Sequence, residues 1–257
     1  MAAWQAVGFC HGVLNTDNMS VLGLTIDYGP YGFLNQYNRH HICNHSDHKG
    51  RYAYYQQPYI VHWNLSRLGG CFQELADYEQ LSQILHDFVA QFQAAYHTQM
   101  RAKLGFKQPE KNDEALFDDL SHVLHTLRCD YTLFFRYLAD LDSTHNAPLP
   151  AKLVNLLGKK VQEPIFQHWL YTYRNRLRTE QHDPNERAAA MNAVNPLYIA
   201  RNHLLHHAIE LAQQGDFAAI HRLQNCLKTP FTEQADYADL ALPPDDDTPV
   251  CVISCSS

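Results

Sequence analysis

The chain has 257 residues, 46% of them hydrophobic, which is enough apolar material for one large packed domain or two small ones. Its 20 Lys and Arg against 27 Asp and Glu give a net charge of −7, which argues against nucleic acid as a partner because phosphate backbones bind basic surfaces. No apolar run approaches the roughly 20 residues of a membrane span, and the first residues do not resemble a signal peptide. We therefore expect a cytoplasmic protein that binds neither nucleic acid nor membrane.

The first part of the chain is rich in Gly, Asn and Tyr and shows short, irregular elements. A short amphipathic helix is predicted over 1–9, followed by the loop 11–18 (HGVLNTDN) and by a short buried strand or hairpin over 21–26. The sequence DYGPYG then favours a turn, because two glycines flank a proline. Residues 32–57 show no sustained hydrophobic period, and we predict an ordered loop there.

Beyond Pro58, apolar residues recur at three- and four-residue spacing, which is typical of helices. Asp113 and Asp183 indicate helix starts, and Pro196 is interpreted as part of a first turn. Helices are predicted near 58–75, 78–104, 113–127, 130–141, 163–179, 184–193, 196–213 and 217–227. The sequence thus divides into a catalytic-loop and metal-binding segment (1–57), a helical part (58–230) and a proline-rich, acidic, flexible tail (231–257).

The loop 11–18 and the turn that follows it match a protein-kinase catalytic loop, in which H-x-D-x-x-x-x-N precedes a D-F-G turn. Here His11, Asn18 and Asp27-Tyr28-Gly29 occupy those places. In kinases, the Asn and the D-F-G Asp hold the magnesium ions that neutralise the nucleotide phosphates, and both side chains offer the oxygen ligands that Mg²⁺ prefers. Asn18 and Asp27 are therefore the candidate metal ligands.

The position where a kinase keeps its catalytic Asp is Val13, which neither accepts a proton nor binds metal, and this disfavours ordinary kinase chemistry. Asp17 precedes Asn18 directly and is the candidate catalytic base, which would take the proton from an attacking hydroxyl. A purely structural alternative remains. In it Asp17 caps a turn, Asn18 takes a left-handed conformation, and the DYG sequence is only a β-turn.

The segments HGVLNTDNMSVLGLTIDYGPYGF and ICNHSDHKGRYA resemble the signature of the selenoprotein O family. VNPLYIARNHL, GDFAAIHRL and the terminal SCSS are also similar to the family, so the resemblance covers essentially the whole chain. It implies a kinase-like fold, with ATP as the substrate and AMP transferred to Ser, Thr or Tyr hydroxyls of proteins. By the same resemblance, Asp17 is the proton acceptor, Asn18 and Asp27 are ligands of Mg²⁺ (with Mn²⁺ as an alternative), and Asp27 also contacts ATP.

The resemblance also implies that this chain is only part of the family's fold. Family members are nearly twice as long, and their amino-terminal half carries a glycine-rich loop, an ion-paired Lys and Glu, and phosphate-binding Arg residues, none of which is present. The expected fold is therefore mainly α with a small β-hairpin, the C-lobe of a kinase-like fold without its N-lobe. AMP transfer by the chain alone is expected to be weak or absent. The alternatives are a kinase-like phosphotransferase and a non-catalytic module that binds nucleotides or partners.

Two histidine clusters and the cysteines need separate interpretation. Residues 39–48 hold four His and Cys43, but their spacing suits no common zinc site, so we expect this loop to brace the active site through hydrogen bonds. His203, His206 and His207 are interpreted as a polar helix face, and the neighbouring Arg201 and Asn202 as anchors of that helix to the catalytic region. The seven cysteines form no CxxC pair.

The terminal cysteine is a redox candidate. Cys255 lies where some family members carry selenocysteine, and a reactive thiol in a flexible tail can exchange with another cysteine. We predict a transient disulfide between Cys255 and Cys43, against the alternative of a tail thiol without function.

Overall fold

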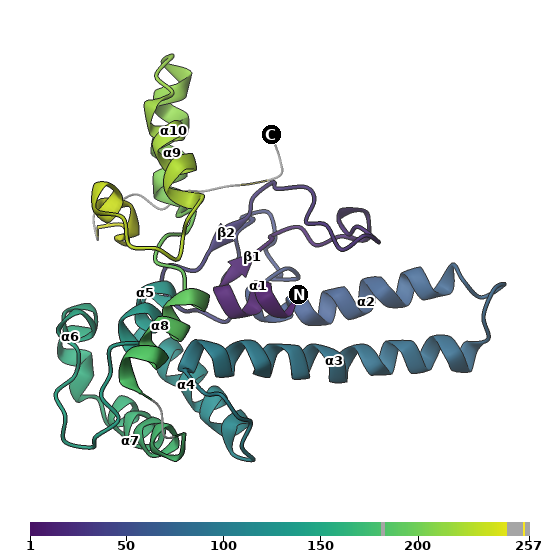
Figure 1. Ribbon diagram of the computed structural model, residues 1–257. Coiled ribbons are helices and arrows are strands. Elements are labelled where there is room, and N and C mark those ends of the chain that lie inside the picture. Colours follow the sequence, from purple (N-terminus) through teal and green to yellow (C-terminus); the bar gives the residue numbers. More distant parts are fainter. Residues whose placement is uncertain (181–182, 246–253, 255–257) are drawn as a thin grey trace. The chain divides into compact units, whose positions relative to one another are not determined.

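The computed structural model describes residues 1–180, 183–245 and 254 of the chain (Figure 1). It is mainly helical with one small two-stranded sheet, in agreement with the expected mainly α fold and small β-hairpin. The described residues fall into two compact units. The first comprises Met1–Gly32 and Arg39–Gln99, together with Ser254, and the second comprises Phe33–Asn38 and the described residues of Met100–Cys251. This division differs from the predicted boundary at residue 58.

The first unit carries the predicted catalytic loop and a long helical hairpin. Its elements in chain order are α1 (Ala2–Val7), β1 (Phe9–Cys10), the 3-10 helix η1 (Thr16–Asn18), β2 (Gly32–Phe33), the 3-10 helix η2 (Tyr54–Gln56), α2 (Gln57–Gly70) and α3 (Tyr78–Leu104), whose last turn belongs to the second unit. β1 and β2 form the small sheet. The helices near 1–9, 58–75 and 78–104 were predicted correctly in place and type.

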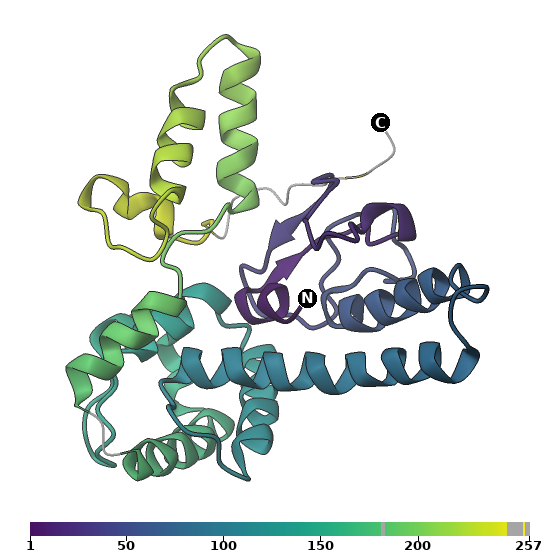
Figure 2. The ribbon, with the colours of Figure 1, turned by 45° about the vertical axis from the view of Figure 1, so that its right-hand side comes forward.

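Helices α2 and α3 run side by side in both views (Figures 1 and 2). An aromatic row at four-residue spacing lies along α3, since the ring centroids of Phe88 and Phe92 are 6.4 Å apart and Phe88 also lies 6.0 Å from the His62 ring of α2. No residue from Tyr78 to Gln99, all of which are described, is buried. The amphipathic pattern that predicted this helix therefore buries little of its apolar face within the described chain.

The second unit is a helical body with a buried apolar core. Its elements are α4 (Asp113–Leu127), α5 (Tyr131–Leu138), α6 (Ala151–Leu157), the 3-10 helix η3 (Gly158–Gln162), α7 (Pro164–Thr179), α8 (Pro184–Val194), α9 (Asn202–Gln213), α10 (Ala218–Leu227) and the 3-10 helix η4 (Ala235–Ala241). Trp169 of α7 stacks on Tyr173 at 4.9 Å, and both rings are buried. Their polar atoms are satisfied, because the indole donates to the Leu116 carbonyl and the Tyr173 hydroxyl to the Leu104 carbonyl.

Helix starts were predicted well where the chain itself supplies the cap. Asp183 accepts hydrogen bonds from the amides of Asn185 and Glu186, which is the capping role its position indicated. Helix α4 also begins at the predicted Asp113, although no side chain of the described residues caps its first turn. By contrast, α6 was not predicted, because seven residues after a proline give too short a pattern to show a helical period.

Three sequence predictions need correction. The helix expected from residue 196 begins only at Asn202, because the Leu197 and Tyr198 amides bond instead to the Pro230 carbonyl. The segment 21–26 is not a buried strand: Val21 is 83% exposed, and the chain here forms a turn closed by a bridge between Met19 and Thr25, which agrees with the hairpin alternative.

The third correction concerns the tail. Residues 235–241 of the predicted flexible segment 231–257 form η4, and Leu240 and Ala241 pack into the apolar cluster of α9 and α10. Ordered structure thus continues at least ten residues further than the composition indicated. The residues 246–253 and 255–257 lie outside the described part of the chain.

Arg201 anchors the second unit internally. Its guanidinium is fully buried, pairs with Asp130 at 2.9 Å and donates to the Asn35 side chain at 2.6 Å and to the Ala241 carbonyl at 3.1 Å. We predicted that it would hold its helix to the catalytic region. The contacts instead join the start of α9 to the start of α5 and to the segment after β2.

Among the described residues, no helix has both the length and the apolar character needed to cross a membrane.

Candidate functional site

The two predicted metal ligands lie together. The Asn18 amide nitrogen donates to the Asp27 carboxylate at 2.6 Å and to the Val13 carbonyl at 2.8 Å. The turn between them, closed by the Met19–Thr25 bridge, returns the chain so that residues nine positions apart meet. An amide and a carboxylate side chain thus meet at an accessible site, joined here through the amide nitrogen. Both residue types carry oxygen atoms of the kind that Mg²⁺ takes as ligands when phosphates complete its coordination.

Asp27 has an unusual backbone conformation. Its φ is 55°, and its carbonyl accepts a hydrogen bond from the Gly29 amide at 2.8 Å. Asp and Asn adopt this left-handed region more readily than other residues with a Cβ. The structural alternative placed the left-handed residue at Asn18, but the sharp turn that presents the carboxylate is centred on Asp27.

His11 fixes the loop to the strand-like segment that leads into Asp27. Its Nε2 lies 2.8 Å from the Ile26 carbonyl, and the Val13 amide donates to its Nδ1 at 3.4 Å. These two contacts are both satisfied when the proton resides on Nε2, which donates to Ile26. The ring is buried and stacks on Trp4 at 5.7 Å, so its orientation is held by packing as well as by hydrogen bonds.

Two buried amide side chains of helix α2 bond to the backbone of the catalytic loop and of the strand before it. Gln57 accepts from the His11 amide and donates to the Phe9 carbonyl, each at 2.9 Å. Asn64 donates to the Leu14 carbonyl at 3.0 Å. We did not predict either residue as part of the site. The sequence did contain an indication of this role, because a Gln and an Asn stand among the apolar residues of the helix and buried amides need hydrogen-bond partners.

Gly12 lies close against the backbone of the turn at Pro30. Its φ is +83°, and a Cβ at this position would lie 2.6 Å from the Pro30 carbonyl oxygen. Only glycine avoids both the strained backbone and this contact.

Changing Gly12 to Ala is expected to lower the free energy of unfolding by about 2 to 4 kcal/mol, because it adds a clash with the Pro30 backbone to the cost of a left-handed alanine. Gly23→Ala is the matched control, since Gly23 has a similar φ of +73° but no atom within 4 Å of the added Cβ. Urea unfolding of both variants isolates the clash. Equal losses in the two variants would contradict the close approach at Gly12.

The structure leaves Asp17 apart from the ligand pair. It lies on η1 with an exposed side chain, and among the described residues no hydrogen bond joins its carboxylate to Asn18 or Asp27. It is available to a group that approaches from solvent. The assignment of Asp17 as base, and of Asn18 and Asp27 as ligands, stays a prediction.

The histidine-rich segment 39–48 and the residues after it contact β1 and the catalytic loop, while bracing of the site by the histidines themselves stays a prediction. The Tyr52 hydroxyl donates to the Asn15 side chain, and the Cys43 thiol lies 3.5 Å from the Cys10 carbonyl. Asp47 closes the loop's own turn by accepting from the Arg51 and Tyr52 amides at 2.8 and 2.7 Å. Within the described residues, no three His, Cys, Asp or Glu side chains gather in a way that could hold a metal ion.

Cys43 is a weakly reactive thiol in this conformation. It is buried, and its contact with Cys10, together with burial, raises its pKa far above the ordinary range of a thiol. Cys255, its predicted partner, lies outside the described residues, although the neighbouring Ser254 hydroxyl is 2.5 Å from that of Ser46. The disulfide stays a prediction, and it would require Cys43 to become exposed first.

Of the three histidines of α9, His206 and His207 are exposed and His203 is partly buried. His206 lies 3.3 Å from Glu210 one turn along the helix, and both side chains are more than half exposed. Burial lowers the pKa of His203, which keeps it neutral near pH 7. This arrangement agrees with the predicted polar helix face.

Comparison with known proteins shows the family to which this chain belongs. The family model described as "Protein adenylyltransferase SelO" matches residues 1–228, and the chain therefore belongs to the SelO family. Relatives named "Protein nucleotidyltransferase YdiU" are 44% identical in Burkholderia ambifaria (strain ATCC BAA-244), 43% in Ralstonia nicotianae and 44% in Yersinia pseudotuberculosis serotype O:1b. Each comparison covers 100% of this chain but only 51%, 52% and 52% of the relative. The chain thus spans about half the length of the curated relatives it matches.

Proposed function

We propose that this chain is the metal- and base-bearing part of a protein adenylyltransferase, with the fold of a kinase C-lobe, that transfers AMP from ATP to Ser, Thr or Tyr hydroxyls of other proteins. The observation that carries the proposal is the contact of 2.6 Å between Asn18 and Asp27, the two side chains expected to bind metal. We place this activity in the cytoplasm, where ATP and protein substrates are both present.

Asn18 and Asp27 would hold Mg²⁺, or Mn²⁺ in its place, and their oxygen donors fit either ion. When bound, the metal would neutralise charge on the phosphates of ATP. Asp17, exposed on η1, would accept the proton of the attacking hydroxyl, while the His11 contact with Ile26 keeps Asp27 in position. No part of this arrangement requires a carboxylate at Val13.

The chain alone contributes one side of this site. It contains no glycine-rich phosphate loop, so the phosphates of ATP would be held here through the metal rather than by backbone amides. We therefore propose that efficient transfer needs a polypeptide equivalent to the other half of the relatives, and that the chain by itself is weakly active or inactive.

The position of the transferred phosphorus distinguishes the proposed reaction from ordinary phosphoryl transfer. ATP labelled at either the α or the γ phosphate would be incubated with Mg²⁺, the chain and a co-expressed polypeptide equivalent to the other half of the Yersinia relative. We expect label in protein from α-labelled ATP only. Label from γ-labelled ATP would instead indicate a kinase-like phosphotransferase. No transfer of either label would contradict the proposed activity and favour the non-catalytic module.

The proposed redox pairing has an independent test. Peptide mapping under non-reducing conditions after mild oxidation should recover Cys43 joined to Cys255. Because Cys43 is buried, we expect the joined peptide to increase when low urea concentrations loosen the first unit. If no oxidant and no urea concentration produced it, the pairing would be wrong.

A further inference from the structure

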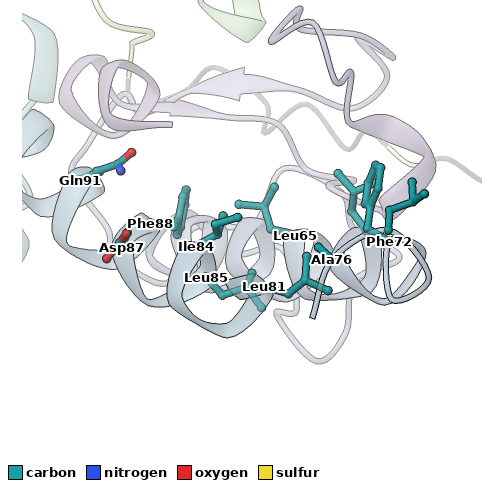
Figure 3. A pocket seen from close by; sticks show the side chains of 12 residues that line it. Leu65, Phe72, Ala76, Leu81, Ile84, Leu85, Asp87, Phe88 and Gln91 are labelled. Atoms are coloured by element: carbon teal, nitrogen blue, oxygen red, sulfur yellow. The ribbon is translucent and has the colours of Figure 1, made fainter. Parts of the chain in front are cut away.

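The helical hairpin of the first unit contains an apolar groove of about 520 Å³. Leu65, Leu68 and Phe72 line it from α2 and its end, and Leu81, Ile84 and Phe88 line it from α3. Figure 3 shows the labelled side chains along the hairpin, from Phe72 near the connection between the helices to Gln91 further along α3. The groove lies apart from Asn18 and Asp27, neither of which lines it.

Several of the apolar side chains around this groove are exposed. Leu75 is 80% exposed and Ile84 is 65% exposed, although Leu, Ile and Phe at i, i+3, i+4 and i+7 normally face a core. A helix of this length depends mainly on packing of its apolar face for its stability. A contiguous apolar surface with such a repeat indicates a surface that is covered in the functional protein.

Acidic side chains outnumber basic ones among the residues of the hairpin around the groove, where Arg67 is the basic residue. Glu74, Asp77, Glu79 and Asp87 are all exposed around the hairpin, and Asp87 also lines the groove. Asp77 is partly engaged as a helix cap, since it accepts from the Gln80 amide at 2.8 Å. An apolar floor with acidic edges is complementary to an amphipathic helix that has an apolar stripe flanked by Lys or Arg.

We propose that this groove is the docking site for an amphipathic, basic-flanked helix from the half of the SelO fold that lies outside this chain. The inference rests on family membership and not on the proposed reaction. Relatives carry about as much additional sequence as this chain spans, and the exposed stripe of α3 is the kind of surface that an additional half would cover. A second copy of this chain is the competing occupant.

The test is co-expression of the chain with a polypeptide equivalent to the unmatched half of the Yersinia pseudotuberculosis relative, followed by sedimentation velocity. We expect a 1:1 complex whose dissociation constant rises at least about tenfold for Ile84→Glu, because a charge would enter the apolar floor. Ile209→Glu is the matched control, since Ile209 is 53% exposed but lies on α9 in the second unit, and its effect should stay within about twofold.

A second measurement uses a thiol already present in the chain. Cys71 is exposed and precedes the groove residue Phe72, so a maleimide should label it in the free chain and more slowly in the complex. Peptide mass mapping identifies the labelled site, and circular dichroism confirms that each variant keeps its helices.

Three results would overturn the proposal. The first is the absence of any complex on co-expression. The second is a complex that Ile84→Glu and Ile209→Glu weaken equally. The third is self-association of the chain that Ile84→Glu abolishes, because this would assign the groove to a second copy. Since none of these results depends on AMP transfer, failure of the docking site and failure of the proposed reaction are distinguishable.

Discussion

Asp27→Asn is expected to weaken Mg²⁺-dependent binding of ATP by at least about tenfold while the fold is kept. The amide can still accept the hydrogen bond from Asn18, so the turn keeps its geometry, but the negative charge that would attract the metal is lost. Isothermal titration of ATP in the presence of Mg²⁺ measures the effect on the wild-type chain and the variant.

Two comparisons make this prediction specific. Removing Mg²⁺ with EDTA should weaken binding to the wild-type chain by a similar factor and should change binding to Asp27→Asn little. Asp17→Asn should leave ATP binding unchanged but abolish AMP transfer when the polypeptide equivalent to the other half is present, because we propose that Asp17 takes the proton and does not bind the metal. Undiminished binding to Asp27→Asn would remove Asp27 from the metal site.

The second large effect concerns Lys103, a buried cation in the second unit. Its ammonium donates to Asn195 at 2.8 Å and lies 4.0 Å from the centre of the Phe135 ring, and burial lowers its pKa to about 7. Its ordinary pKa is about 10.5. At a pH between these two pKa values, Lys103 carries a proton in the unfolded chain but not in the folded chain. The free energy of unfolding therefore rises with pH in this range. The cost of burying the charge is fully present below about pH 7.

Lys103→Met removes this cost. The free energy of unfolding of the variant minus that of the wild type is therefore expected to be larger at pH 6.5 than at pH 9, by roughly 2 to 3 kcal/mol. Urea unfolding of both proteins at the two pH values measures the change. Lys152→Met is the control, because its side chain is 59% exposed and its replacement should give a difference that is nearly independent of pH. A constant difference for Lys103→Met as well would mean that Lys103 stays charged in the folded protein.

The sequence predicted helices wherever a local signal set their limits. Asp183 caps α8 through its own carboxylate, and the Asp-Pro pair at 183–184 indicates such a helix start directly. The start of α9 was missed because it depends on distant partners. Asn195 is held by Lys103, and the following amides bond to the carbonyl of Pro230, so the proline at 196 enters an extended segment instead of a first turn. Hydrogen bonds between such distant residues produce no periodic pattern in the sequence.

The proximity of Asn18 and Asp27 was predictable from the sequence, but the residues that support them were not. Asn18 and Asp27 follow from the order of polar residues around a turn, and the structure brings them together. Gln57 and Asn64 were missed because their roles depend on where α2 lies against the loop backbone, which no residue spacing in the loop indicates. The same holds for Gly12, whose need for glycine comes from Pro30 eighteen positions later.

The turn after Asn18 has a consequence for the amount of this protein in a cell. Val21, Leu22 and Leu24 are exposed there, as are the apolar side chains of the helical hairpin. Chains that display such surfaces are retained by chaperones and degraded by proteases in proportion to the time they spend uncovered. The steady-state amount of this protein would then be set by the supply of whatever covers these surfaces, and an unmatched excess would be cleared rather than accumulate.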